Sequence, residues 1–179
     1  METAVLGGGC FWCLEAVFEQ VLGVESVKSG YCGGKKPNPS YSEVCEGHTG
    51  HVEVVEINFN PASIMFSDLL RIFFAIHDPT TLNRQGNDVG SQYRSAIFYQ
   101  TPEQQHEADE VIAELGRQQI WDAPIITQVV PAQPFYPAEG YHRQYFRTHP
   151  EQAYCSVVVA PKVARFRKRF APLLKAEYR

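Results

Sequence analysis

The sequence has no long apolar stretch. No segment approaches the roughly 20 apolar residues that a membrane-spanning helix needs, and the first residues, Met1 to Val5, include no basic group ahead of an apolar run. These absences argue against a transmembrane anchor and against an export signal. We therefore expect a cytoplasmic protein that has no membrane partner.

Internal repeats, low-complexity segments and linkers are also missing. A chain of 179 residues with 44% hydrophobic residues is long enough to bury one sizeable core and too short to suggest two. We expect residues 1–179 to form a single domain and the protein to be a monomer.

The cysteine count is odd. Five cysteines in a chain without an export signal argue against a static disulfide framework. The thiols are therefore expected to be reduced, and either reactive or simply buried.

Negative charge is scarce at the C-terminal end. Residues 162–179 contain seven Lys or Arg against the single acid Glu177, although the whole chain has a net charge of −4. The basic residues alternate with Phe166, Phe170 and Leu173 at helical spacing, which is typical of the solvated face of an amphipathic helix. We therefore do not expect a nucleic-acid partner.

Apolar periodicity predicts the order strand, helix, strand, strand, helix, strand, helix, strand, followed by the basic helix. The first six elements match the ferredoxin-like split βαβ plait, an α+β fold with helices on one face of a sheet, here with extra terminal and loop elements. The predicted strands are 3–6, 24–31, 51–59, 95–100 and 125–130. The predicted helices are 10–21, 67–76 capped by Ser67, and 102–120 capped by Thr101 with Gln104 completing a capping box.

The polar stretch 78–92 is too long for an ordinary connection, and Gly86 to Gly90 concentrates turn residues within it. We interpret it as a functional loop.

Cys10 follows three glycines and opens the first predicted helix. Free backbone N–H groups and the helix dipole at such a position favour the thiolate. The alternative is a tight turn with Cys10 as a small buried side chain. The large Trp12 beside it favours a functional role, and the stretch lacks the residues of a nucleotide-binding loop.

Cys10 and Cys13 form a C-x-x-C motif, which is also found in thiol–disulfide oxidoreductases. That activity is our alternative hypothesis.

Strand 51–59 carries an acid on its apolar face. Alternation places Glu53 with Val55, Ile57 and Phe59, whereas Glu56 faces the other way. A buried carboxyl group has a raised pKa and can serve as a general acid near neutral pH. The alternative is a solvated Glu53 at a frayed strand start.

The residue types that could ligate a metal include Cys45, His48, His51 and His142. Their spacing matches no zinc motif, so we expect no metal.

Four blocks of sequence together resemble the A-type peptide methionine sulfoxide reductases. They span nearly the whole chain, and they are Gly9-Cys10-Phe11-Trp12, Tyr41-x-x-Val44-x-x-Gly47-x-Thr49-Gly50-His51-x-Glu53, Asn83-Arg84-Gln85-Gly86-Asn87-Asp88-x-Gly90-x-Gln92-Tyr93-Arg94-Ser95, and His142-x-x-Tyr145.

The resemblance implies reduction of the S epimer of methionine sulfoxide, free or in proteins. It implies that the Cys10 thiolate attacks the sulfoxide sulfur and that Glu53, Tyr41 and Tyr93 stabilise or protonate the departing oxygen. It further implies that Phe11 and Trp12 form an apolar wall for the S-methyl group, with Asp88 as a polar residue of the same site.

The same resemblance implies that Cys155 resolves the sulfenic acid left on Cys10 as a disulfide, and that thioredoxin or a similar dithiol restores the enzyme. No cofactor is implied. The chain has Cys13 where the family often has glycine and Cys32 where it often has alanine, and no further cysteine follows Cys155. Cys13 and Cys32 therefore remain alternative resolving thiols.

Overall fold

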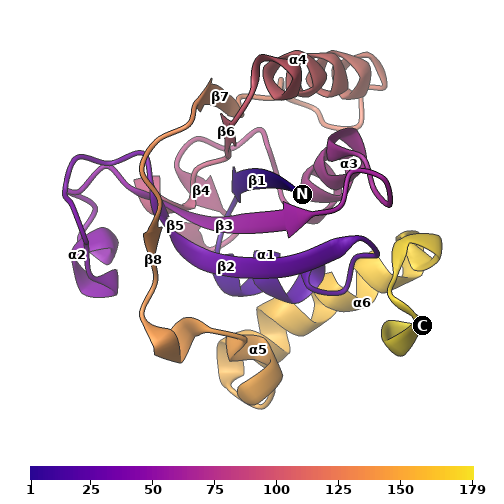
Figure 1. Cartoon of the computed structure of the whole chain (residues 1–179). Helices are drawn as coiled ribbons and strands as arrows, with labels where there is room; N and C mark the ends of the chain where they lie inside the picture. The colour runs from indigo at the N-terminus through magenta and orange to yellow at the C-terminus, as the bar shows by residue number, and fades with distance from the viewer.

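The computed structural model describes all residues 1–179 and contains a six-stranded sheet in the order β7-β6-β1-β3-β2-β8 (Figure 1). The strands of this sheet are β1 (Glu2–Gly7), β2 (Val24–Cys32), β3 (Val52–Phe59), β6 (Ala96–Tyr99), β7 (Gln128–Pro131) and β8 (Tyr136–Pro137). The helices are α1 (Phe11–Phe18), α2 (Tyr41–Cys45), α3 (Phe66–Ile76), α4 (Pro102–Arg117), α5 (Tyr145–Thr148) and α6 (Ala160–Arg169).

The four central strands, β6-β1-β3-β2, are antiparallel throughout. Helix α1 connects β1 to β2, and α3 connects β3 to β6, so that each crossover passes over one intervening strand. This is the split βαβ arrangement, and the α+β prediction is confirmed. Strand β7 extends the sheet by parallel pairing with β6, and β8 pairs with the other edge at β2.

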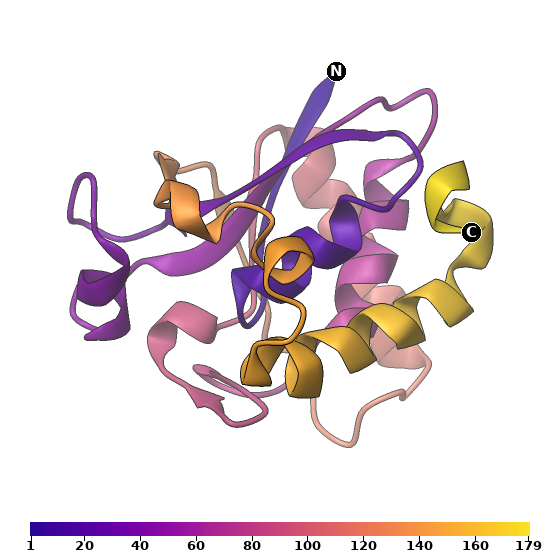
Figure 2. The ribbon, with the colours of Figure 1, turned by 90° about the horizontal axis from the view of Figure 1, so that it is seen from below.

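The core is divided by the sheet. The larger cluster contains the inward faces of α1, α3 and α6 together with Val55, Ile57 and Phe59 of β3. Alternate residues of the same strand, Val52 and Val54, belong to a smaller cluster on the other face. Figure 2 shows α1, α3 and α6 gathered on one side of the strands. Side chains of β3 that share the larger cluster therefore face α1, α3 and α6.

Several helix limits differ from the sequence prediction, and one of them is the end of α4, which lies at Arg117 and not at residue 120. Helix α1 ends at Phe18 and not at residue 21. Ser67 is not an N-cap, because α3 begins after Met65, whose N–H donates to Asp68 Oδ2 at 3.3 Å. The C-terminal helix ends at Arg169, where Phe170 leaves helical geometry and short 3-10 turns follow.

The start of α4 is as predicted in one respect and different in another. Thr101 Oγ1 accepts the N–H of Gln104 at 3.1 Å, so the predicted cap is confirmed. The Gln104 side chain does not return to Thr101. It accepts the N–H of Gln100 and donates to Thr3 O, which ties α4 to the edge of β1.

Several short elements lie outside the predicted helices and strands. Helix α2 has a complete capping box between Ser40 and Glu43. The polar stretch 78–92 contains the two-residue strands β4 (Arg84–Gln85) and β5 (Asp88–Val89), followed by a 3-10 turn, Ser91–Tyr93.

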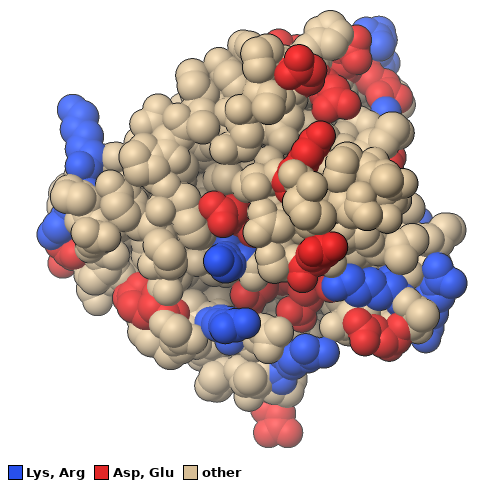
Figure 3. All heavy atoms as spheres, in the orientation of Figure 1, with Lys and Arg blue, Asp and Glu red and all other residues tan.

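The charge asymmetry of the sequence is visible on the surface. Figure 3 shows acidic side chains over the end that holds α4 and basic ones around the C-terminal residues. Val163 and Phe166 of α6 are buried, whereas Arg165 and Lys168 are exposed, so the amphipathic interpretation of this helix is confirmed. None of the helices is both long and apolar enough to span a membrane.

Candidate active site

A turn of three glycines places Cys10 at the start of α1. Gly9 has φ +85°, and its N–H donates to Tyr93 O at 3.1 Å. A Cβ atom on Gly8 would lie 2.8 Å from the ring of His77, so a side chain there would collide with the core. Cys10 is the N-cap residue of α1 and is 7% exposed.

Glu53 lies directly beside this helix start. Its Oε1 accepts the N–H of Phe11 at 3.2 Å, and the carboxyl group is completely buried. Burial raises the pKa of Glu53 to about 8, and the Phe11 N–H opposes this only in part. The face predicted from strand alternation is confirmed. At neutral pH Glu53 therefore holds a proton, and its Oε2 has no hydrogen-bond partner.

The expectation of an acidic Cys10 thiol is wrong for the free protein. Burial raises the pKa of Cys10 well above its usual value, and the negative charge of Glu53 adds to the rise. The Trp12 N–H at the helix start lowers the pKa, as expected, but by less. The resting site thus holds a thiol and a carboxylic acid side by side.

The side chains of Tyr41 and Tyr93 lie near Cys10 and Glu53, although the two residues belong to separate elements. Tyr41 begins α2, where its N–H donates to Glu139 Oε2 and its ring stacks on Phe11 with centroids 6.2 Å apart. Tyr93 ends the 3-10 turn that holds Gly9. Burial, and then the charge of Glu53, raises the pKa of both phenols, so both retain their protons. They are two further O–H donors around the thiol.

An aromatic wall stands on the other side of Cys10. The Trp12 ring stacks on Tyr145 with centroids 3.9 Å apart, and its Nε1–H donates to His142 Nδ1 at 3.0 Å. Tyr154 packs edge-on against Trp12. Phe11 is fully buried behind this wall, with its centroid 5.1 Å from that of His142.

Sequence reasoning weighed His142 only as a metal ligand, used His142 and Tyr145 as a block of the family resemblance, and gave no role to Tyr154. These residues lie some 130 positions after Trp12, so nothing local connects them. The available signal was the density of aromatic residues between Tyr141 and Tyr154, together with the His-x-x-Tyr spacing.

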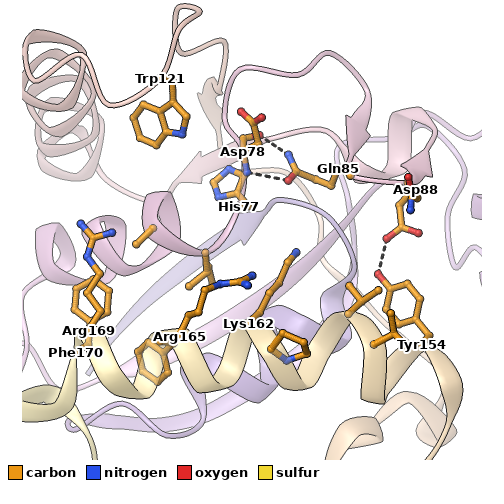
Figure 4. Close-up of a pocket in the computed structure, with 18 of the residues that line it drawn as sticks. His77, Asp78, Gln85, Asp88, Trp121, Tyr154, Lys162, Arg165, Arg169 and Phe170 are labelled. Atoms are coloured by element: carbon orange, nitrogen blue, oxygen red, sulfur yellow. Dashed lines mark hydrogen bonds between the residues drawn. The ribbon is translucent and has the colours of Figure 1, made fainter.

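Asp88 lies at the rim of the site around Cys10. It is half-buried in β5, and Tyr154 donates its hydroxyl proton to Asp88 Oδ2. A groove of about 1100 Å³ runs past both residues along α6, as Figure 4 shows. Cys10 does not line this groove, so the groove is adjacent to the thiol site and distinct from it.

All five cysteines are unpaired. Cys10, Cys13 and Cys155 share the larger core cluster, whereas Cys32 belongs to the smaller cluster on the opposite face of the sheet. Burial raises the pKa of Cys13 to about 11, and the charge of Cys155 contributes to that rise. Cys13 and Cys155 are therefore neighbours on the same face of the sheet as Cys10. Cys45 is exposed on α2.

The histidines that could ligate a metal either hydrogen-bond to the backbone or lie apart from one another. His51 Nδ1 accepts the N–H of Gly34 at 3.0 Å, and its Nε2 lies 2.7 Å from Lys36 O. Both ring nitrogens are thus occupied. His48, His142 and Cys45 do not assemble with it into a group suited to hold a metal ion.

A thiol beside a protonated carboxyl group, with further thiols in the same core, defines a cysteine-dependent oxidoreductase. The family model of peptide methionine sulfoxide reductase matches residues 2–173. The chain belongs to this family, and its activity is the reduction of methionine sulfoxide in peptides.

Relatives and solved structures agree with this assignment. Peptide methionine sulfoxide reductase MsrA of Ralstonia nicotianae is 59% identical over 98% of this chain and 94% of its own. The enzyme of Polynucleobacter asymbioticus is 56% identical over 99% and 94%. Methionine sulfoxide reductase A of Corynebacterium diphtheriae superposes with a TM-score of 0.79 at 36% identity, covering 83% of this chain and 75% of that one. Reduced Mxr1 of Saccharomyces cerevisiae gives 0.78 at 33%, covering 86% and 88%.

Proposed function

We propose that this protein reduces the S epimer of methionine sulfoxide, free or in proteins, with Cys10 as nucleophile and Glu53 as proton donor. The observation that carries the assignment is the buried Glu53 carboxyl group at the start of α1. It keeps its proton at neutral pH, and its Oε2 has no partner within the protein. An oxygen that is being expelled from sulfur needs such a proton.

In the first step the Cys10 thiolate attacks the sulfoxide sulfur. The bond that this attack forms between Cys10 Sγ and the substrate sulfur then breaks as the protonated oxygen passes from that sulfur to Sγ, so methionine leaves and Cys10 becomes a sulfenic acid. Glu53, with Tyr41 and Tyr93 as additional donors, protonates or hydrogen-bonds the sulfoxide oxygen during this transfer. The raised pKa of Cys10 implies that its proton leaves only when substrate and donors are in place.

Substrate binding uses the aromatic wall. Trp12 supplies the apolar surface for the S-methyl group, with the buried Phe11 packed behind it, and Asp88 contributes a polar group at the rim. The Trp12 ring is fixed by stacking on Tyr145 and by its hydrogen bond to His142, which supports a preformed pocket.

In the second step Cys155 condenses with the sulfenic acid, giving a disulfide and water. Cys155 begins a π-helical segment, Cys155–Val159, that packs against α1. Such segments are frequent at functional sites. Cys32 is on the wrong face of the sheet for this reaction. A dithiol such as thioredoxin then reduces the disulfide; yeast Mxr1 has been solved in complex with Trx2.

We further propose that the chain works as one domain and as a monomer in the cytoplasm. The family model spans almost the whole chain, and five unpaired thiols suit a reducing compartment.

Turnover of the two separated epimers of N-acetyl-methionine sulfoxide, with dithiothreitol as reductant, tests the activity. We expect reduction of the S epimer and none of the R epimer. If neither epimer is reduced while disulfides are exchanged, the protein is instead a C-x-x-C thiol–disulfide oxidoreductase.

A single turnover without reductant tests the resolving thiol. The wild type should lose two titratable thiols for each methionine formed, because Cys10 and Cys155 become a disulfide. Cys155→Ser should release methionine but retain a sulfenic acid that dimedone labels. Cys13→Ser is the matched control and should still form the disulfide. The opposite pattern in the two variants would assign the resolving role to Cys13.

A further inference from the structure

The groove along α6 is unusually basic on one wall. Lys162, Arg165 and Arg169 line it at positions i, i+3 and i+7 of the helix, and Figure 4 shows all three side chains rising from α6 into the groove. Arg169 lies over the ring of Phe170, with 5.4 Å between its Cζ and the ring centroid.

These three cations have no anionic partner in the protein. The ion pairs of the structure involve other residues, and none of the three lies within ion-pair distance of a carboxylate. The two acids that line the groove are already engaged. Asp78 Oδ1 accepts from Thr80, and Asp88 Oδ2 accepts from Tyr154. The groove lining therefore carries three cations against two carboxylates, and the three cations lie together along α6 without an ion-pair partner.

The rest of the groove suits a polypeptide. Trp121 and Phe170 supply apolar surface at the end far from Asp88, and Val157, which also lines the groove, is 72% exposed. Lys162 to Arg169 spans about 10 Å of helix, which corresponds to about three residues of an extended chain. Asp88 and Tyr154 join this surface to the aromatic wall at Cys10.

We propose that the groove binds the chain segment that flanks the oxidised methionine, and that it selects acidic residues in that segment. The proposal rests on the proposed function, since it names the kind of protein substrate that the same site takes. Free methionine sulfoxide, which has no flanking segment, does not use the groove.

The test compares S-sulfoxide peptides of eight residues in which a triplet on one side of the oxidised methionine is acidic, serine or lysine. Both placements of the triplet, before and after the methionine, are measured. Dithiothreitol is the reductant, so that docking of a protein reductant does not enter. For one placement we expect kcat/KM for the acidic peptide to exceed that for the lysine peptide about tenfold at low salt. The preference should shrink in 0.5 M NaCl.

Charge reversal in the groove identifies the residues responsible. Arg165→Glu/Arg169→Glu should abolish or invert the preference and leave turnover of N-acetyl-methionine sulfoxide unchanged. The matched control is Lys168→Glu/Arg117→Glu. It alters net charge equally, and Lys168 is exposed on α6 outside the groove. This control should retain the preference.

Equal kcat/KM for the acidic and lysine peptides in both placements would overturn the proposal, as would loss of the preference in the control. A groove variant that raises the KM for thioredoxin but keeps the peptide preference would assign the groove to the reductant. Failure of the wild type to reduce N-acetyl-methionine sulfoxide would overturn the proposed function itself, and the inference with it.

Discussion

Cys10→Ser should lower kcat/KM for the S epimer of methionine sulfoxide by at least about 1,000-fold, because a serine hydroxyl cannot replace the attacking thiolate. The loss should be the same with dithiothreitol and with thioredoxin, since no sulfenic acid forms for either to clear. Steady-state turnover measures the effect, and release of methionine in a single turnover shows that chemistry itself has stopped. The substitution exchanges sulfur for oxygen in a nearly buried position, so the fold should persist.

Cys32→Ser provides the control. Cys32 lies in the smaller cluster on the opposite face of the sheet, so its loss should leave turnover close to that of the wild type. Thermal melting of both variants confirms that they are folded. Retention of turnover in Cys10→Ser, with its loss in Cys13→Ser, would transfer the nucleophilic role to Cys13.

Local sequence signals were sufficient for the parts of the site that depend on one element. The glycine turn predicted a helix start at Cys10, and the alternation of β3 predicted the buried face of Glu53. The N-cap of α3 was missed by two positions, because Ser67 is a good cap by residue type, whereas the N-cap is Met65, whose N–H donates to Asp68. Side-chain preference alone cannot decide between neighbouring starts of this kind.

The rest of the site depends on contacts between distant segments. Trp12 is fixed by His142 and Tyr145, and Asp88 by Tyr154, 66 positions away. The pKa of Cys10 also could not be predicted from local sequence alone. The helix start alone favours a lower value, but burial by the folded chain reverses the sign. Only the packing of the whole fold determines that balance.

Glu53→Gln should lower kcat for the S epimer by about 100- to 10,000-fold, because glutamine can accept the Phe11 N–H but cannot transfer a proton. The wild-type kcat/KM should fall as the pH rises through about 8, where Glu53 loses its proton, and the variant should lack that decline. Glu56→Gln is the control on the same strand. Glu56 faces the opposite side of β3, so its loss should leave both turnover and the pH profile intact.

The pH dependence of protein stability is an independent test of whether Glu53 holds a proton. In the unfolded chain Glu53 ionises near pH 4.5, whereas in the folded protein it holds its proton to about pH 8. The folded state therefore loses stability, about 5 kcal/mol at most, as the pH rises from 4.5 to 8. Glu53→Gln should escape this loss, so its melting temperature relative to the wild type should increase with pH across that window. A constant difference between pH 5 and pH 9 would show that Glu53 is already ionised in the folded protein and cannot be the proton donor.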